Sequence, residues 1–224
     1  MKYFTVTCSC LFFVLNLSGQ TSLSEVNYDR IPKKKVCQLI ENLQKKDGLH
    51  NFTDLHSTCC DNPEEYHTHY AEYLVEADLE TVWQAYNSVS PAKAWNGKMV
   101  GFGMLYSSAQ NGISYLDDSF SGIEVGQLVF INLKILLGIV NVPVVIEITG
   151  IDKEQHMLQF CYADCSKSEG TQILHFFSTP EGFTRVEHLS YFRSDSKMRD
   201  KNLYPFFHTK VLNEFHGNIA KLLK

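Results

Sequence analysis

The chain has 224 residues, of which 44% are hydrophobic and 12% aromatic, and its formal net charge is −5. This share of apolar residues is enough to build a folded core, which excludes an intrinsically disordered chain. The negative balance argues against a nucleic-acid-binding protein, because such a protein needs a basic surface to neutralise phosphates.

Residues 1–20 have the pattern of a cleavable signal peptide, so the chain is predicted to be periplasmic or secreted. Lys2 precedes an apolar run, Tyr3 to Leu15, that is too short and too rich in hydroxyl groups to span a bilayer comfortably. Small and polar residues follow at residues 17–20, where a peptidase could cut. A retained anchor helix is the alternative. No later apolar run reaches eighteen residues without a charge, so we expect no stable membrane insertion after processing.

Five of the cysteines follow the predicted signal peptide: Cys37, Cys59, Cys60, Cys161 and Cys165. An odd number leaves at least one unpaired if every bridge is internal. Adjacent cysteines rarely bridge each other, and a disulfide could join the Cys59–Cys60 pair to Cys161 or Cys165. With so few cysteines in so large a domain, we expect stability not to depend on a disulfide framework.

Residues 21–65 form a predicted extension with one short helix. Apolar residues stand at helical spacing before Asp47-Gly48, which ends the pattern. They are Val36, Leu39, Ile40 and Leu43. The extension could cover one edge of the sheet that follows it, an edge that would otherwise invite pairing with another chain.

Residues 66–224 form the main predicted domain. A strand starts at Tyr66, and Asp78 caps the helix that follows it. A second short helix or turn is predicted at residues 91–95. Turn residues then separate seven further predicted strands, at 98–107, 112–116, 125–137, 142–151, 155–163, 170–178 and 183–193. One long helix is predicted from Asp200 to Leu223, because an apolar stripe there repeats every three to four residues.

Consecutive strands joined by short turns must be antiparallel, and a sheet of this size twists and curls. Its concave face needs a cover, and the long amphipathic helix is the only predicted element with enough apolar surface. The predicted fold is therefore α+β, a curved antiparallel β-sheet wrapped around a long C-terminal α-helix.

The segment Val75–Tyr86, with Ser90-Pro91 and Trp95 after it, carries a resemblance to a known family. A strand that leads into the pattern A-x-x-E-x-V-W resembles the entry to the first helix in the START/Bet v1-like, or helix-grip, superfamily, also called SRPBCC. The resemblance covers about residues 66–224. Further segments are similar to an uncharacterised bacterial and plant branch; they are Gly126 to Gly138, Phe160-x-Tyr162, Glu169-Gly170, Ser190 and Tyr204-Pro205.

The resemblance implies a hollow between the sheet and the C-terminal helix that holds an apolar or amphipathic small molecule. Members of the superfamily include both binding proteins for lipids or sterols and enzymes, so the fold does not decide between these functions. The extension and the predicted export depart from typical members of the superfamily.

The last predicted strand supplies candidate polar groups for this hollow. His188, Ser190 and Phe192 alternate with residues that suit solvent and are predicted to face inward. A His and a Ser on an apolar wall are convergent groups of the kind that orient a ligand. Glu147 and His175 could join them if their strands place them inward. The C-terminal helix would add Phe207 and Val211.

Signals for other chemistry are weaker. No G-x-S-x-G elbow, P-loop or complete dinucleotide fingerprint is present in the sequence. Asp117-Asp118 has the character of a turn. Several histidines and cysteines gather in the chain without matching a zinc module, so neither a metal nor a cofactor is predicted. They are His50, His56, Cys59, Cys60, His67 and His69.

We therefore expect an exported binding protein for a hydrophobic or amphipathic, lipid-like small molecule. One alternative is an enzyme that acts on a lipid- or polyketide-like substrate through His188 and a carboxylate. The other is an interaction module whose hollow is filled by its own side chains. The 15 Phe and 11 Tyr leave this last alternative open, because bulky aromatic side chains fill space as readily as they line it.

Overall fold

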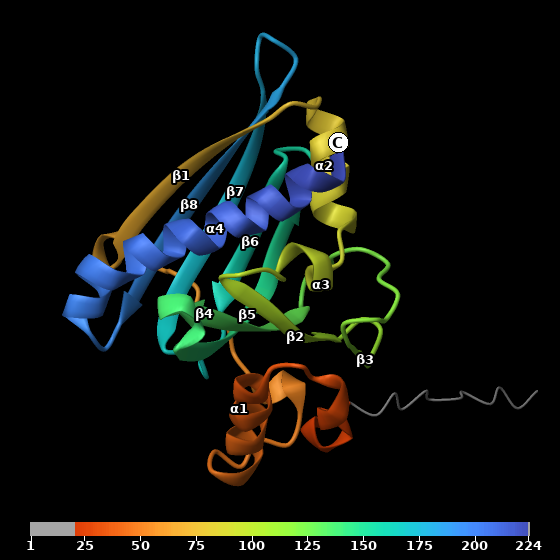
Figure 1. Ribbon diagram of the computed structural model, residues 1–224, viewed down its shortest axis with the longest axis vertical. Coiled ribbons are helices and arrows are strands. Elements are labelled where there is room, and N and C mark those ends of the chain that lie inside the picture. The colour runs from red at the N-terminus through yellow and green to blue at the C-terminus, as the bar shows by residue number, and fades with distance from the viewer. Residues whose placement is uncertain (1–20, 224) are drawn as a thin grey trace, which may run out of the picture.

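The computed structural model describes residues 21–223, so the predicted signal peptide lies outside the described residues. Within them, eight antiparallel strands form one sheet in the order β1-β8-β7-β6-β5-β4-β2-β3 (Figure 1). The strands are β1 His67–Val75, β2 Val100–Ser107, β3 Gly112–Ser114, β4 Leu128–Ile135, β5 Val140–Asp152, β6 Met157–Tyr162, β7 Ser168–Ser178 and β8 Thr184–Ser194. The α-helices are α1 Lys34–Lys45, α2 Leu79–Ser88, α3 Pro91–Ala94 and α4 Tyr204–Ala220. The predicted α+β fold is confirmed.

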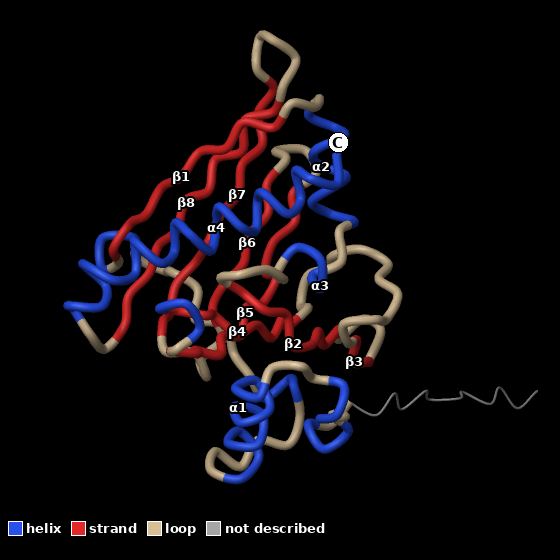
Figure 2. Tube along the Cα trace, in the orientation of Figure 1, coloured by secondary structure: helices blue, strands red, loops and turns tan. Residues whose placement is uncertain are grey.

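The sheet curves and α4 crosses its concave face (Figures 1 and 2). Register shifts in β2, between Phe102 and Met104, and in β5, between Ile148 and Gly150, increase the local twist of both strands. Helices α2, α3 and α4 cover this face and share one apolar core with it. Trp95, just after α3, stacks on Phe215 of α4 with 4.1 Å between ring centroids.

The C-terminal helix is less regular than the sequence predicts. A π-helical turn, Arg199–Leu203, precedes α4, and a 3₁₀ turn, Lys221–Leu223, follows it. Pro205 in the first turn of α4 has no N–H to donate to the preceding turn, which accounts for a change of helix type there. Ser196 accepts a hydrogen bond from the Arg199 N–H and so caps the start of the helical segment.

The N-terminal extension covers the outer face of the sheet, where it forms a second core with β2, β4 and β5. Phe52 of the extension is fully buried and stacks on Tyr106 of β2, with 4.4 Å between ring centroids. A Cβ at Gly103 would lie 2.9 Å from Val36 of α1, so glycine permits this close approach. The extension thus covers a face of the sheet, and it also contacts Asn111 and Tyr115, on either side of the edge strand β3.

Strands β4 and β5 are consequently buried on both sides. Val129 and Ile131 of β4 belong to the inner core, whereas Leu128 and Phe130 belong to the outer core. Successive residues of a strand point to opposite faces, so burial of both faces requires a continuous apolar run. This explains why residues 128–148 of the sequence are so uniformly hydrophobic.

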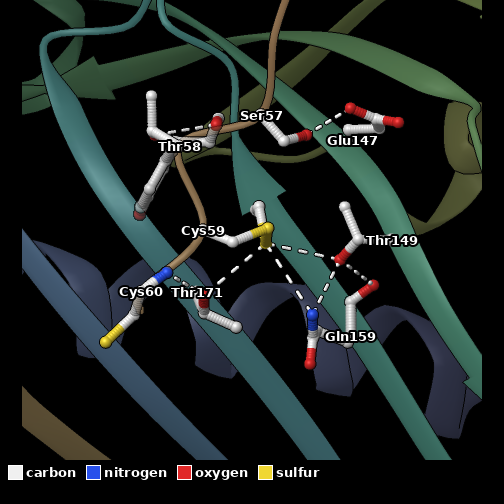
Figure 3. The surroundings of a disulfide bond; sticks show 10 residues. Ser57, Thr58, Cys59, Cys60, Glu147, Thr149, Gln159 and Thr171 are labelled. Carbon is white, nitrogen blue, oxygen red and sulfur yellow. Dashed lines mark hydrogen bonds between the residues drawn. A yellow bond between two sulfur atoms is a disulfide. The ribbon is translucent and has the colours of Figure 1, made fainter. Parts of the chain in front are cut away.

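A disulfide between Cys59 and Cys161 ties the extension to β6 (Figure 3). It is one of the pairings that the sequence left open. Among the described residues, Cys37, Cys60 and Cys165 are free. No helix within residues 21–223 is long and apolar enough to cross a membrane.

Candidate functional site

A cavity of about 410 Å³ lies between the concave face of the sheet and α4. This volume is in the range of small-molecule binding sites. Inward-facing residues of β4 and β5 supply one wall and α4 supplies the other. The main apolar lining residues are Trp95, Met99, Ile131, Leu133, Val142, Val144, Ile146, Leu203, Phe207, Val211 and Leu212. The structure thus places Phe207 and Val211 in the wall of a hollow, where the sequence predicts them.

One end of the cavity is polar. Gln172 of β7, Tyr162 of β6, and Tyr204 and His208 of α4 all line it. The Gln172 amide N–H₂ donates to the Tyr162 hydroxyl at 3.2 Å, and that hydroxyl lies 2.5 Å from the hydroxyl of Tyr204. The Gln172 carbonyl lies 2.9 Å from Nε2 of His188 and 3.3 Å from Nε2 of His208. One amide therefore contacts Tyr162, His188 and His208 directly, and Tyr204 through Tyr162.

The network continues behind the cavity wall through two more histidines. Nδ1 of His188 lies 2.9 Å from Nε2 of His216, and Nδ1 of His216 lies 2.6 Å from the Tyr86 hydroxyl. On the other branch, Nδ1 of His208 lies 3.2 Å from Nδ1 of His69. Both branches start from the same Gln172 carbonyl.

The assigned amide orientation determines which nitrogens carry protons. Because the Gln172 carbonyl can only accept, His188 and His208 must donate through Nε2. Each neutral ring then accepts at Nδ1, from His216 and from His69. The Tyr86 hydroxyl donates to His216. Every ring nitrogen between Tyr86 and Gln172 therefore has a matched partner.

Burial keeps this network uncharged at neutral pH. Desolvation lowers the pKa of His188 and of His208 well below the usual value, and neighbouring histidines add to the effect. It lowers the pKa of His216 to about 3. In the same way, burial raises the pKa of Tyr162 to about 12 and that of Tyr204 well above its usual value. The polar end of the cavity thus offers neutral hydrogen-bonding groups.

The charged residues of the cavity wall are all basic. They are Lys134 at the end of β4, Lys167 before β7 and Arg199 in the π-helical turn before α4. Lys134 donates to the carbonyl of Gly97, and Arg199 forms an ion pair with Asp195 at 3.1 Å. The cavity wall thus combines a large apolar area with a cluster of neutral polar groups and three cationic side chains.

The three predicted site residues of β8 face inward, but they lie behind the cavity wall. His188, Ser190 and Phe192 are buried and absent from the cavity lining. His188 reaches the cavity through Gln172, and Phe192 reaches it through Tyr204, on which it stacks with 3.5 Å between ring centroids. The Ser190 hydroxyl has no hydrogen-bond partner among the described residues.

Glu147 and His175 lie on the other face of the sheet, so the condition on which their prediction depended is not met. Both neighbours of Glu147 along β5, Ile146 and Ile148, belong to the inner core, and alternation sends Glu147 outward. There it accepts a hydrogen bond from Ser57 of the extension (Figure 3). His175 is outward for the same reason, since its neighbours Leu174 and Phe176 point inward.

The sequence predictions missed Gln172 and His208 in the cavity wall and His216 behind it. His208 and His216 stand one position after Phe207 and Phe215, which belong to the apolar stripe that predicted the helix. Their spacing with Leu212, four residues from each, is the helical signal that could have found them. Gln172 stands in register with Ser190, so the inward prediction for Ser190 implied an inward Gln172 as well.

The remaining candidates do not form a site. His67 and His69 face the same side of β1, but His67 packs against Phe192 and His69 against His208. No group of three metal-binding side chains within residues 21–223 has the geometry to hold an ion. Asp118 accepts from the Tyr115 N–H and pairs with Arg30 at 2.7 Å, as a turn residue would.

A second hollow, of about 650 Å³, lies at the surface between α3 and residues 116–120. Its lining contains exposed Lys93 and Asp117 but no buried polar network. The hollow beneath α4 is the stronger candidate, because a mostly apolar wall with a few convergent polar groups is typical of small-molecule sites.

Comparison with solved structures finds the same fold in proteins of low sequence identity. Ginseng major latex-like protein 151 from Panax ginseng is 12% identical, with a TM-score of 0.50, over 69% of this chain and 95% of that one. Norcoclaurine synthase from Thalictrum flavum is 13% identical, with a TM-score of 0.52, over 70% of this chain and 92% of that one. Protein Ms6760 from Mycobacterium smegmatis is 15% identical, with a TM-score of 0.50, over 71% of this chain and 92% of that one. Comparisons with models of protein families and with curated proteins give no match.

Proposed function

From the helix-grip fold of the START/Bet v1-like superfamily, and from the hollow that this fold encloses beneath α4, we propose that the protein binds a hydrophobic or amphipathic small molecule there. The observation that carries the proposal is the cavity of about 410 Å³, apolar along most of its wall and polar at one end. An apolar wall stabilises a ligand by removing its surface from water, and a few polar groups fix its orientation.

The polar end suggests which ligand group would lie there. Tyr204, His208 and Gln172 are neutral at physiological pH, so they suit a hydroxyl or carbonyl group of the ligand. A lipid-like molecule with one such group would place its apolar part along β4 and β5. The fold is compatible with small ligands, because a structure of norcoclaurine synthase from Thalictrum flavum contains dopamine and hydroxybenzaldehyde.

The two alternatives receive less support. An open cavity argues against a hollow filled by the protein's own side chains. The hypothesis of an enzyme that pairs His188 with a carboxylate lacks its second group, because both ring nitrogens of His188 contact Gln172 and His216. Glu147, the carboxylate considered for this role, lies on the outer face of the sheet.

Export through the predicted signal peptide remains part of the proposal. The Cys59–Cys161 disulfide supports it, because structural disulfides form and persist in oxidising compartments. The test is the mass of the protein recovered from its host's secretory compartment. A mature chain that starts near residue 21 supports export with cleavage of the signal peptide. A chain that keeps residues 1–20 supports the retained anchor helix instead, and absence of the protein from that compartment contradicts export.

Native mass spectrometry of the purified protein, with organic extraction of what co-purifies, tests the binding function directly. The second readout is a titration with a fluorescent fatty acid. Val211→Trp should fill the cavity and weaken probe binding by about tenfold or more, because overpacking leaves no space for the ligand. Val125→Trp, at an exposed loop position, is the matched control and should bind as the unaltered protein does. Clean apo protein that takes up no probe would contradict the proposal.

A further inference from the structure

Exposed apolar side chains gather at two segments that border the cavity beneath α4. One is the connection between β4 and β5, and the other is the start of the C-terminal helix (Figure 1). Leu136 and Val140 of the first segment and Leu203 of the second line the same cavity, so both segments reach its rim. The mouth patch is defined here as Leu136, Ile139, Val140, Met198, Leu203 and Phe206.

This gathering is unusual for residues in contact with water. The mouth patch holds half of the exposed large hydrophobic residues among those whose side chains the structure describes. Ile139 is 82% exposed and Phe206 is 55% exposed. Single exposed apolar residues are ordinary, but a cluster of them marks a surface that another molecule covers.

The charge beside the mouth patch is basic, although the chain as a whole carries −5. Lys134, Lys167 and Arg199 line the cavity, and the Lys210 ammonium lies 4.1 Å from the centre of the Phe206 ring. The exposed carboxylate of Asp195, close to Met198 in the chain, pairs with Arg199 at 3.1 Å, which leaves Lys134, Lys167 and Lys210, with the exposed Lys197 and Lys201, as the excess of positive charge. Asp200, in the same segment, is buried and accepts hydrogen bonds from Ser194. Exposed apolar side chains among cationic groups suit an anionic lipid surface. The apolar side chains can insert between the headgroups, and the anionic headgroups attract the cationic groups.

We propose that the mouth patch docks onto an anionic membrane surface, with the β4–β5 connection and Phe206 inserted at the level of the headgroups. Docking in this orientation would place the cavity entrance against the bilayer, so an apolar ligand could pass between them without crossing water. The passage of ligand rests on the proposed function, whereas docking itself depends only on the mouth patch and the cations beside it.

Co-sedimentation of the purified protein with lipid vesicles tests the docking. We expect binding to vesicles of phosphatidylcholine mixed with phosphatidylglycerol, weaker binding to phosphatidylcholine alone, and loss of binding at high salt. The variant Ile139→Asp/Phe206→Asp should lose about tenfold or more in vesicle affinity, because it places two carboxylates at the insertion site. Neither residue lines the cavity.

The matched control is Leu74→Asp/Val125→Asp, which makes the same change of charge at two exposed apolar positions outside the mouth patch. It should bind vesicles as the unaltered protein does. Absence of binding to the mixed vesicles would overturn the docking proposal, and so would equal losses in the two double variants. A concentration-dependent dimer that only Ile139→Asp/Phe206→Asp dissociates, without vesicle binding, would also overturn it and assign the patch to a second copy of the chain.

Titration with the fluorescent fatty acid in vesicle-free solution separates the two proposals. The mouth-patch variant should take up the probe as the unaltered protein does, since the cavity wall is unchanged. Vesicle binding without probe uptake in the unaltered protein would reject the proposed ligand function and leave the docking proposal standing. Probe uptake without vesicle binding would reject the docking proposal and leave the proposed ligand function standing.

Discussion

Gln172 connects the two branches of the buried polar network to the cavity. Its carbonyl accepts from His188 and His208, and its amide N–H₂ donates to Tyr162. A leucine at this position would have a similar size but could make none of these hydrogen bonds. Both imidazole N–H groups would then remain buried without an acceptor.

We predict that Gln172→Leu lowers the free energy of unfolding by about 1–3 kcal/mol for each donor left unpaired. Urea denaturation monitored by circular dichroism measures this loss. Gln155→Leu, the same replacement in an exposed turn, serves as the control and should change stability little. A Gln172→Leu protein as stable as its control would mean that the network contributes nothing to the fold.

The buried histidines also predict how stability depends on pH. His69, His188, His208 and His216 have lowered pKa values in the folded protein, whereas the unfolded chain protonates histidine near pH 6.5. Below about pH 6.5 these histidines are therefore protonated in the unfolded state but remain neutral in the folded state, so the unfolded state binds more protons. The stability that the neutral histidines contribute is fully present above about pH 6.5. It is lost as the pH falls toward the pKa values of the folded protein, and the pKa of His216 in the folded protein is about 3.

Urea unfolding at a series of pH values between about 7 and 5 should show this loss, with a slope of up to about 1.4 kcal/mol per pH unit for each buried histidine. Replacing His216 by phenylalanine removes one titrating group and should reduce the slope, whatever it does to stability at neutral pH. An identical slope in the two proteins would contradict the assignment of His216 as a buried neutral base.

At the scale of elements, the disulfide fixes the extension to the sheet. Cys59 and Cys161 are 102 residues apart in the chain, so their bond closes a long loop in the unfolded state. Closing a loop of this size lowers the conformational entropy of the unfolded chain, which in the chain-entropy model stabilises the folded protein by several kcal/mol. The expectation from the cysteine count, that stability does not depend on disulfides, therefore needs a direct test.

We predict that a reductant lowers the free energy of unfolding by about 3–5 kcal/mol. The measurement is urea unfolding with and without dithiothreitol. The Cys59→Ala/Cys161→Ala variant should start from the lower stability and should not respond to the reductant. If the unaltered protein has the same midpoint in both buffers, the disulfide has no stabilising role.

At the scale of the whole molecule, the extension is part of the fold rather than an appendage. Leu23, Val36, Ile40 and Phe52 of the extension are buried against the outer face of β2, β4 and β5. Without them that face would expose a set of large apolar side chains. These are Met104, Tyr106, Leu128, Phe130 and Val145.

A chain of residues 66–224 alone should therefore aggregate or form oligomers, because an apolar face of this kind is not stable in water. Size-exclusion chromatography of the truncated and full chains makes the comparison. In the full chain, Phe52→Ala should cost about 3–5 kcal/mol in urea unfolding, as expected for a buried aromatic residue. A monomeric 66–224 fragment with a cooperative transition like that of the full chain would contradict this prediction.

Local patterns were enough to predict the elements and their order. Alternation and turn residues located the strands, the stripe from Tyr204 to Ile219 located α4, and the spacing of Val36 to Leu43 located α1. They also predicted the inward direction of His188, Ser190 and Phe192. These features depend on residues a few positions apart, so periodicity carries them.

The tertiary structure alone decided which of these residues meet. Glu147 and His175 point outward because their neighbours along β5 and β7 point into the core. A register shift of a single residue would turn both side chains inward. The assembly of Gln172, Tyr86, Tyr162 and the four histidines joins β1, β6, β7, β8 and α2 with α4, elements that lie far apart in the sequence. Hydropathy and spacing by themselves thus determined a curved sheet that grips a helix. Where that grip leaves an open cavity, and which polar groups enter it, depends on side-chain volumes from distant segments, which no local pattern encodes.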